Sequence, residues 1–338
     1  MTRVRYQDQT IELAPDQTVL DALLEQGIEV PFSCGNGVCQ TCLMRATEGN
    51  PPEESQKHLS PALKLRNHFM SCVCRPTEDL TVTLPAEGEA TLTAVVSHLE
   101  PLNADILRVD LLVDAPFDYR AGQFLTLLKA DSLGRSYSLA SVPGLNTHLE
   151  LHIRRLPEGR ISGWVHDELR VGQEVTIRGP GGNCFYLPGQ PEQPLLLIGT
   201  GSGLAPLYGI LRDALRQGHT GLIRLYHGSR SAEGLYLKNE LRELAGLHPN
   251  LEYIPCLSGE AVPEGHAPGR ADDFALTENT DLKGWRVFLC GHPDMVQQAQ
   301  IRAYLAGASL QEIHADAFHV ERHPFDKSEP GPDEGTQS

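Results

Sequence analysis

Four cysteines in the first quarter of the chain constrain its fold more than any other feature. They are Cys34, Cys39, Cys42 and, well after these three, Cys72. A C-x4-C-x2-C spacing with a distant fourth cysteine predicts a 2Fe–2S cluster, because one tight loop and one remote segment must converge on two irons. Gly35 and Gly37 allow the loop unusual dihedral angles and let backbone N–H groups face the cluster sulfurs.

Two other uses of these cysteines compete with the cluster. A tetrahedral zinc site is one, although zinc ribbons prefer two C-x2-C pairs, and a few reactive thiols are the other. The fourth ligand also stays open on spacing alone. Cys72 and Cys74 alternate along a predicted strand, so both side chains are expected on the same face.

Residues 1–84 resemble a plant-type ferredoxin domain, which implies a β-grasp fold of the α+β class. In that family the segment after the cluster loop reads Cys-x-x-x-Pro, which matches Cys72 to Pro76. The resemblance therefore implies Cys72 as the fourth ligand and Cys74 as its neighbour. The expected early elements are a hairpin at Arg3–Tyr6 and Thr10–Leu13 and a helix at Val19–Gln26.

Residues 91–188, after a linker at 85–90, carry short alternating stretches separated by Gly, Pro and Asp. This pattern predicts an antiparallel barrel of about six strands. A helix signal interrupts it, with Ser162 as the N-cap of residues 163–169. The expected strands are Thr91–Ser97, Ile106–Leu112, Phe124–Leu128, Ser136–Leu139, Leu149–Ile153 and Glu174–Arg178.

One strand of this barrel carries Arg135, Ser136, Tyr137 and Ser138. On a strand, the arginine and the tyrosine project to one face and the two serines to the other. A guanidinium beside an aromatic ring suits a flavin dinucleotide, which needs a fork for its pyrophosphate and a flat surface for its ring system. The alternative is an ordinary surface pair.

The order of these residues and the later turn at Gly159–Ser162 resembles the flavin-binding domain of the ferredoxin–NADP reductase superfamily. The resemblance implies bound FAD, with Arg135 at the pyrophosphate and Tyr137 packed on the flavin. Ser136 and Ser138 then flank the flavin, where Tyr137 and Ser138 take part in catalysis. Gly159 and Ser162 would cap the phosphates at the start of the helix.

Residues 189–320 alternate between apolar strands and helices, which predicts an open parallel sheet of the α/β class. The expected strands are Pro194–Ile198, Leu222–His227, Leu251–Leu257 and Val287–Cys290, and the expected helices are Leu207–Gln217, Leu235–Leu244 and Asp294–Gly307.

A glycine-rich turn follows the first of these strands and consists of Gly199, Thr200, Gly201, Ser202 and Gly203. Its spacing is not G-x-G-x-x-G, and a flexible loop is the plain alternative. The turn resembles the pyridine-nucleotide turn of the same superfamily.

A second signature of that superfamily is matched by Phe288–Pro293. The resemblance implies that Cys290 lies beside the nicotinamide and shapes the hydride-transfer pocket, and that Gly291 lets the ligand approach. The alternative for Cys290 is an inert buried thiol. We expect ordinary packing of Cys184 and Cys256, and no histidine shows a metal-ligand spacing.

Nucleotide preference depends on the end of the second strand of this domain. Arg230 can pair with the 2′-phosphate of NADPH or with the pyrophosphate of NADH, whereas Glu233 disfavours the extra phosphate. The sequence favours NADH and allows NADPH.

Near the C-terminus, Asp316-Ala317-Phe318 matches the acidic and aromatic pair that the superfamily places near the flavin. The alternative for Phe318 is an ordinary packed aromatic side chain. Residues 321–338 are expected to form a disordered acidic tail.

Charge and hydropathy limit the partners. The 28 Lys+Arg and 44 Asp+Glu residues give a net charge of −16, and no basic run offsets it. A nucleic-acid or anionic-membrane partner is therefore not expected. The chain shows no apolar stretch typical of a signal peptide or a membrane helix. We expect a cytoplasmic location, where cysteines stay reduced.

Taken together, the motifs resemble the three-domain reductase components of bacterial mono- and dioxygenases. The resemblance implies an NAD(P)H-dependent iron–sulfur flavoprotein oxidoreductase. It would pass a hydride from NADH to FAD, and then single electrons through the 2Fe–2S cluster to an oxygenase component or a ferredoxin. Two alternatives stay open: a reductase partner in deoxysugar biosynthesis, and a redox-sensing module of low turnover.

Overall fold

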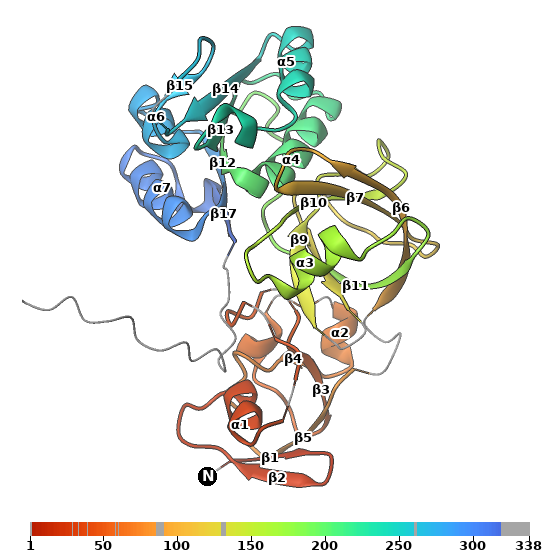
Figure 1. The fold of residues 1–338 in the computed structure, drawn as a ribbon. Helices are drawn as coiled ribbons and strands as arrows, with labels where there is room; N and C mark the ends of the chain where they lie inside the picture. Colours follow the sequence, from red (N-terminus) through yellow and green to blue (C-terminus); the bar gives the residue numbers. More distant parts are fainter. Residues whose placement is uncertain are drawn as a thin grey trace, which may run out of the picture.

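Three sheets, each at the centre of one domain, follow one another along the chain, and the middle domain lies between the other two (Figure 1). The computed structural model describes residues 2–28, 30–32, 34–38, 40–57, 59, 61–85, 91–129, 133–259 and 262–318. The expected tail at 321–338 lies outside them.

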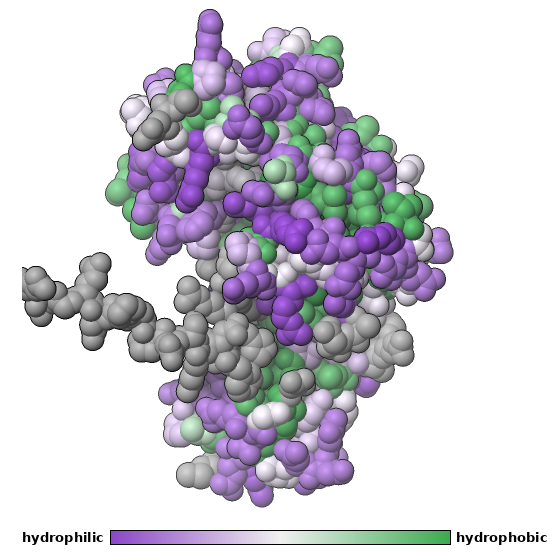
Figure 2. All heavy atoms as spheres, in the orientation of Figure 1, coloured by the Kyte–Doolittle hydropathy of each residue, from purple (hydrophilic) through white to green (hydrophobic). Residues whose placement is uncertain are grey.

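On the face in Figure 2, hydrophilic side chains cover much of the surface and hydrophobic residues gather in smaller patches. Among the described residues, no helix combines the length and apolar character needed to cross a membrane.

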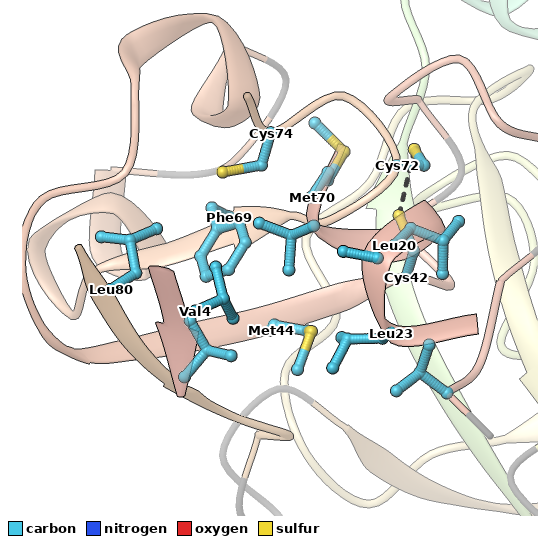
Figure 3. Close-up of a cluster of buried hydrophobic side chains, with 14 of the residues drawn as sticks. Val4, Leu20, Leu23, Cys42, Met44, Phe69, Met70, Cys72, Cys74 and Leu80 are labelled. Atoms are coloured by element: carbon cyan, nitrogen blue, oxygen red, sulfur yellow. Dashed lines mark hydrogen bonds between the residues drawn. The ribbon is translucent and has the colours of Figure 1, made fainter. Parts of the chain in front are cut away.

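The first domain is a five-stranded sheet with the strand order β2-β1-β5-β3-β4. The pairing of β1 with β5 is parallel, as a β-grasp sheet requires, and the other pairs are antiparallel. Thr18 caps α1 by accepting from the backbone N–H of Asp21, and Leu20 and Leu23 of this helix pack on the sheet (Figure 3). Its elements are β1 Arg3–Tyr6, β2 Gln9–Glu12, α1 Val19–Glu25, β3 Leu43–Glu48, α2 Pro61–Leu65, β4 His68–Met70 and β5 Leu80–Thr83.

The second domain is the expected six-stranded antiparallel barrel, with the order β10-β7-β6-β11-β8-β9. A bridge between Leu139, directly after β9, and Leu151 in β10 brings the two edge strands together and closes the sheet. Alternate residues of every strand fill the interior. Its elements are β6 Leu92–Pro101, β7 Ile106–Leu112, β8 Phe124–Leu128, β9 Gly134–Ser138, β10 Leu149–Arg154, α3 Arg160–Asp167 and β11 Glu174–Gly181.

The third domain is the expected open sheet, with all described pairs parallel and the order β15-β14-β13-β12-β16-β17. Successive residues of β12 pack on opposite faces: Leu195 and Leu197 toward α4 and α5, Leu196 and Ile198 toward α6 and α7. Its elements are β12 Leu195–Thr200, α4 Leu204–Arg216, β13 Ile223–Ser229, α5 Lys238–Leu247, β14 Leu251–Leu257, β15 Ala267–Pro268, α6 Ala271–Glu278, β16 Arg286–Gly291, α7 Pro293–Leu305 and β17 Ile313–Ala317.

Some element boundaries differ from the sequence prediction. Ser162 is not an N-cap, because α3 begins at Arg160 with Gly159 as its cap. The helix expected from Leu235 begins at Lys238, since Leu237 has a left-handed φ of 52°. Helix α6 was not expected, and the buried Asp272 in its first turn interrupts the apolar pattern that would have revealed it.

Candidate functional site

The cluster loop brings two of the predicted ligands into contact. The Sγ atoms of Cys42 and Cys72 lie 3.2 Å apart, and both side chains are buried (Figure 3). Cys34 is half-buried, accepts from the backbone N–H of Asn36 at 3.4 Å, and lies close enough for its charge to act on the other two thiols. Cys39 lies outside the described residues.

Cys74 lies apart from this pair. The expectation that Cys72 and Cys74 share a strand face is wrong, because β4 ends at Met70 and the next residues form a turn. Cys74 is fully buried, and burial raises its pKa to about 12 although the interaction with Ser55 lowers it. Figure 3 shows its sulfur separated from the Cys42–Cys72 contact. Cys74 therefore lies outside the sulfur contact that Cys42 and Cys72 make, and Cys72 stays the predicted fourth ligand.

The backbone of the cluster loop fits thiolate ligands. Gly35 and Gly37 adopt left-handed φ angles of 64° and 70°, and a Cβ on Gly37 would lie 2.7 Å from Cγ2 of Val73. The N–H of Gly37 faces the Cys72 sulfur, and the hydrogen bond between Cys42 and Cys72 lowers the pKa of Cys42 and raises that of Cys72. Converging sulfurs with backbone donors around them are the environment that a 2Fe–2S cluster needs, so the residues present fit this group.

The predicted flavin residues lie along β9. Arg135 and Tyr137 are half-buried, and burial raises the pKa of Tyr137, so its hydroxyl stays protonated. The Ser136 hydroxyl lies 3.1 Å from the Thr126 hydroxyl of β8. Ser136 thus contacts the neighbouring strand, and it, Arg135 and Tyr137 all stay partly exposed.

Ser138 joins the barrel to the third domain. Its hydroxyl donates to a carboxylate oxygen of Asp316 at 3.0 Å, and Asp316 in β17 pairs in register with Cys290 in β16. The backbone N–H of Phe318 donates to the Gly291 carbonyl at 2.8 Å. The structure thus brings together the two regions in which catalysis was predicted, and Asp316 lies between them.

The start of α3 opens on a cavity of about 560 Å³, lined by residues 154–159 with Asp105 and Gly163. Gly159 is the N-cap, and nothing described lies within 4 Å of a Cβ placed on Gly163. Ser162 accepts from the backbone N–H of Leu156 at 3.1 Å and donates to the Gly159 carbonyl at 3.3 Å. An open helix N-terminus fits the phosphates of a dinucleotide, while the Ser162 side chain is used to shape the turn.

The glycine turn lies directly against the second nucleotide signature. A Cβ on Gly203 would collide with the backbone carbonyl of Cys290, and one on Gly291 would lie 2.7 Å from the Thr200 hydroxyl. Gly291 has a left-handed φ of 128°. Only glycine allows the two turns to approach this closely. Gly199, Gly201 and Ser202 belong to the same turn, at the carboxyl end of β12 where open sheets bind ligands.

Cys290 has a neighbour that the sequence did not reveal. Its Sγ atom lies 3.6 Å from that of Cys184, which follows β11, and both side chains are buried. Burial, together with the hydrogen bond to Cys184, raises the pKa of Cys290 well above its ordinary value. Cys184 was expected to pack without a partner, and no sequence motif links it to Cys290.

The nucleotide-preference residues lie after β13. Arg230 is exposed, and a hydrogen bond from Ser231 lowers the pKa of the exposed Glu233. The carboxylate is therefore ionised at neutral pH.

A buried ionic network also joins the barrel to the third domain. Glu150 in β10 accepts from His152 at 2.9 Å, and the other ring nitrogen of His152 lies 3.2 Å from the Tyr236 hydroxyl. Arg212 of α4 lies 3.9 Å from Glu150. Burial opposes ionisation of Glu150, but the hydrogen bond to His152 and the nearby arginines outweigh it and lower the pKa. These residues are far apart in sequence, and no motif predicts them.

Three known protein families match this chain, one for each of the three domains. Residues 3–77 match a 2Fe-2S iron-sulfur cluster binding domain, residues 93–186 an oxidoreductase FAD-binding domain, and residues 197–300 an oxidoreductase NAD-binding domain. These matches and the geometry define the class: an NAD(P)H-dependent iron–sulfur flavoprotein oxidoreductase, with a 2Fe–2S cluster, FAD and NAD(P)H as cofactors.

Relatives of the same organisation align over nearly the whole chain. The reductase component of a naphthalene 1,2-dioxygenase system from Pseudomonas putida is 31% identical, covering 91% of this chain and 95% of that protein. The reductase subunit of an aromatic O-demethylase from an Amycolatopsis species is 35% identical, covering 91% and 96%. The crystal structure of an Amycolatopsis cytochrome P450 reductase has a TM-score of 0.68 at 32% identity, covering 94% and 99%. The chain belongs to this family of three-domain ferredoxin–NAD(P)+ reductases.

Proposed function

We propose that the protein is the reductase component of an oxygenase system. It takes a hydride from NADH onto FAD and delivers single electrons through the 2Fe–2S cluster to an external oxygenase component or ferredoxin. The observation that carries the proposal is the position of the barrel. Its β9 strand bonds to Asp316 of the nucleotide domain, and its β11 strand bonds to the cluster loop. The family relatives named for dioxygenase and demethylase systems support the same acceptor class.

Cys34, Cys39, Cys42 and Cys72 would hold the cluster, which supplies one-electron transfer when bound. FAD would be held by Arg135, Tyr137, Gly159 and Ser162, with Ser136 and Ser138 beside it. The nicotinamide nucleotide would be held by the 199–203 turn and Gly291. Cys290 would line the hydride-transfer pocket as a protonated thiol, and Phe318 would lie next to the flavin. The domain boundaries 1–84, 91–188 and 189–320 enclose the three family matches. The cytoplasmic location stays a prediction.

NADH is the proposed donor. The ionised Glu233 lies three residues after Arg230, so a 2′-phosphate at this turn would meet a negative charge. Arg230 would then bind the pyrophosphate or the adenine side.

An anaerobic titration with NADH, and separately with NADPH, tests the proposal. Followed by visible absorbance and EPR, it should show a flavin and a rhombic 2Fe–2S signal that both respond to NADH at lower concentration than to NADPH. Steady NADH-dependent reduction of cytochrome c should follow. If the protein with FAD and cluster bound reduces cytochrome c at a negligible rate, the reductase assignment is wrong. The alternative function, a redox-sensing module of low turnover, would then be favoured.

A further inference from the structure

Arg178 lies at the boundary between the first two domains. It belongs to β11 of the barrel, only 9% of its surface is exposed, and its Nη1 donates to the main-chain carbonyls of Gln40 at 2.9 Å and Thr41 at 3.3 Å. These two residues stand inside the cluster loop, directly before Cys42. The barrel therefore holds the ligand loop by its backbone.

Other contacts converge on the same short segment. Gln40 has a left-handed φ of 59° and is buried, and a Cβ on Gly181 of β11 would lie 3.3 Å from its amide nitrogen. A Cβ on Gly134, the first residue of β9, would lie 3.4 Å from Cγ2 of Thr41. Both barrel positions lack a side chain where the loop approaches, so the loop packs directly on the barrel.

The anchoring residue is in register with the predicted flavin strand. Arg178 pairs with Thr126 in β8, and Thr126 pairs with Ser136 in β9, between Arg135 and Tyr137. Paired residues in adjacent strands are close neighbours. A single row across three strands thus connects the cluster loop to Ser136, the residue between the two that would hold FAD.

We propose that Arg178 is a positioning residue for electron transfer between the flavin and the cluster. Its guanidinium fixes the distance between the cluster loop and β9, and its buried positive charge would favour the reduced, more negative state of the cluster that the loop would hold. Arginine suits this buried position better than lysine, because a planar guanidinium is more weakly hydrated than an ammonium and donates in fixed directions. The role rests on the proposed function, since it presupposes both cofactors.

Two variants test this role. Arg178→Gln removes the positive charge, and Arg178→Lys keeps the charge but removes the planar guanidinium. In stopped-flow experiments on the loaded protein, flavin reduction by NADH should be unchanged in both variants. The following transfer to the cluster should slow by about tenfold or more in Arg178→Gln, because small displacements of reacting groups have large effects on rate. The cluster potential should become more negative in Arg178→Gln and change little in Arg178→Lys.

A readout independent of turnover is amide hydrogen exchange. The Leu43 amide bonds to the Gln40 carbonyl that Arg178 holds, so exchange in the peptide covering residues 40–44 should be faster in both variants. Arg170→Gln is the matched control, because Arg170 also donates to two main-chain carbonyls but within the barrel, at 2.8 Å each. It should leave the transfer rate, the potential and the exchange of this peptide unchanged.

NADH-dependent ferricyanide reduction by the same samples, which flavin alone supports, shows that the barrel of each variant is folded. If wild type contains no cluster or flavin, the proposed function fails. If wild type behaves as a reductase but both Arg178 variants keep its transfer rate, potential and exchange, the role of Arg178 is wrong and the proposed function stands.

Discussion

Two pairs of cysteines lie close together in this protein, and their surroundings differ. Cys42 and Cys72 lie 3.2 Å apart in a glycine-containing loop with backbone donors, and their shared hydrogen bond lowers the pKa of Cys42 while it and burial raise the pKa of Cys72. Cys184 and Cys290 lie 3.6 Å apart in a closed apolar interior, and burial raises the pKa of Cys290. The distance between sulfurs is similar, so it does not decide their function. The cluster loop holds one thiol of its pair, Cys42, with a lowered pKa, whereas the resolved shift in the second pair, at Cys290, is upward.

The largest effect should come from breaking the first pair. Cys72→Ser should abolish the 2Fe–2S absorbance and EPR signal and the reduction of cytochrome c. NADH-dependent ferricyanide reduction should persist, because flavin alone supports it. Cys74→Ser is the matched control, since Cys74 lies two residues away but apart from the Cys42–Cys72 contact, and it should retain the cluster. Loss of the cluster only in Cys74→Ser would reverse the ligand assignment.

A smaller effect should follow from disturbing the loop that supplies the donors. Gly37→Ala adds a methyl group 2.7 Å from Val73 at a φ of 70°, so the Gly37 N–H should move away from Cys72. Gly35→Ala is subject to similar dihedral strain, about 1 kcal/mol, but meets no described atom within 4 Å. Cluster release on mild heating, measured by loss of visible absorbance, should be several-fold faster in Gly37→Ala than in Gly35→Ala. Equal rates would show that the Val73 contact does not matter.

The second pair should affect hydride transfer rather than the cluster. Cys290→Ala removes a sulfur at the carboxyl end of β16, so the nicotinamide should be held less closely. The flavin reduction rate with NADH should fall about fivefold, in line with the sensitivity of transfer to position. Cys184→Ala, which leaves Cys290 in place, should reduce it less. Both variants should keep the full cluster spectrum, and loss of that spectrum would contradict the separation of the two pairs.

The sequence predicted the first pair but not the second. Three ligands on one loop follow one another at fixed short spacings, so Cys34, Cys39 and Cys42 form a motif, whereas Cys72 was chosen over Cys74 through the resemblance to the ferredoxin family. Cys184 and Cys290 meet because the barrel and the parallel sheet pack together, and packing between domains leaves no local pattern.

The same distinction holds for the fold. Alternating or continuous apolar stretches gave the order of the sheets and most strands, and the glycine turn marked the end of β12. The sequence did not give β17, whose His314 and Asp316 obscure a strand pattern, nor Arg178, whose partners lie in another domain. Ser162 was misplaced because serine is a common N-cap, whereas Gly159 takes that position and Ser162 bonds back to the turn.

The smallest effect should be a change in the pH dependence of stability. Because the pKa of Cys290 is raised above its ordinary 9.0, the folded protein keeps this proton at a pH where the unfolded chain loses it. The resulting stability is fully present below pH 9 and is lost as the pH rises above 9, by about 1.4 kcal/mol per pH unit. Urea unfolding between pH 8 and about 10 should therefore show a shallower decline in Cys290→Ala than in wild type. Cys184→Ala keeps the buried Cys290 thiol and should retain most of the decline. Identical slopes in all three proteins would mean that Cys290 ionises as easily when folded as when unfolded, and the contrast with the cluster cysteines would lose its electrostatic basis.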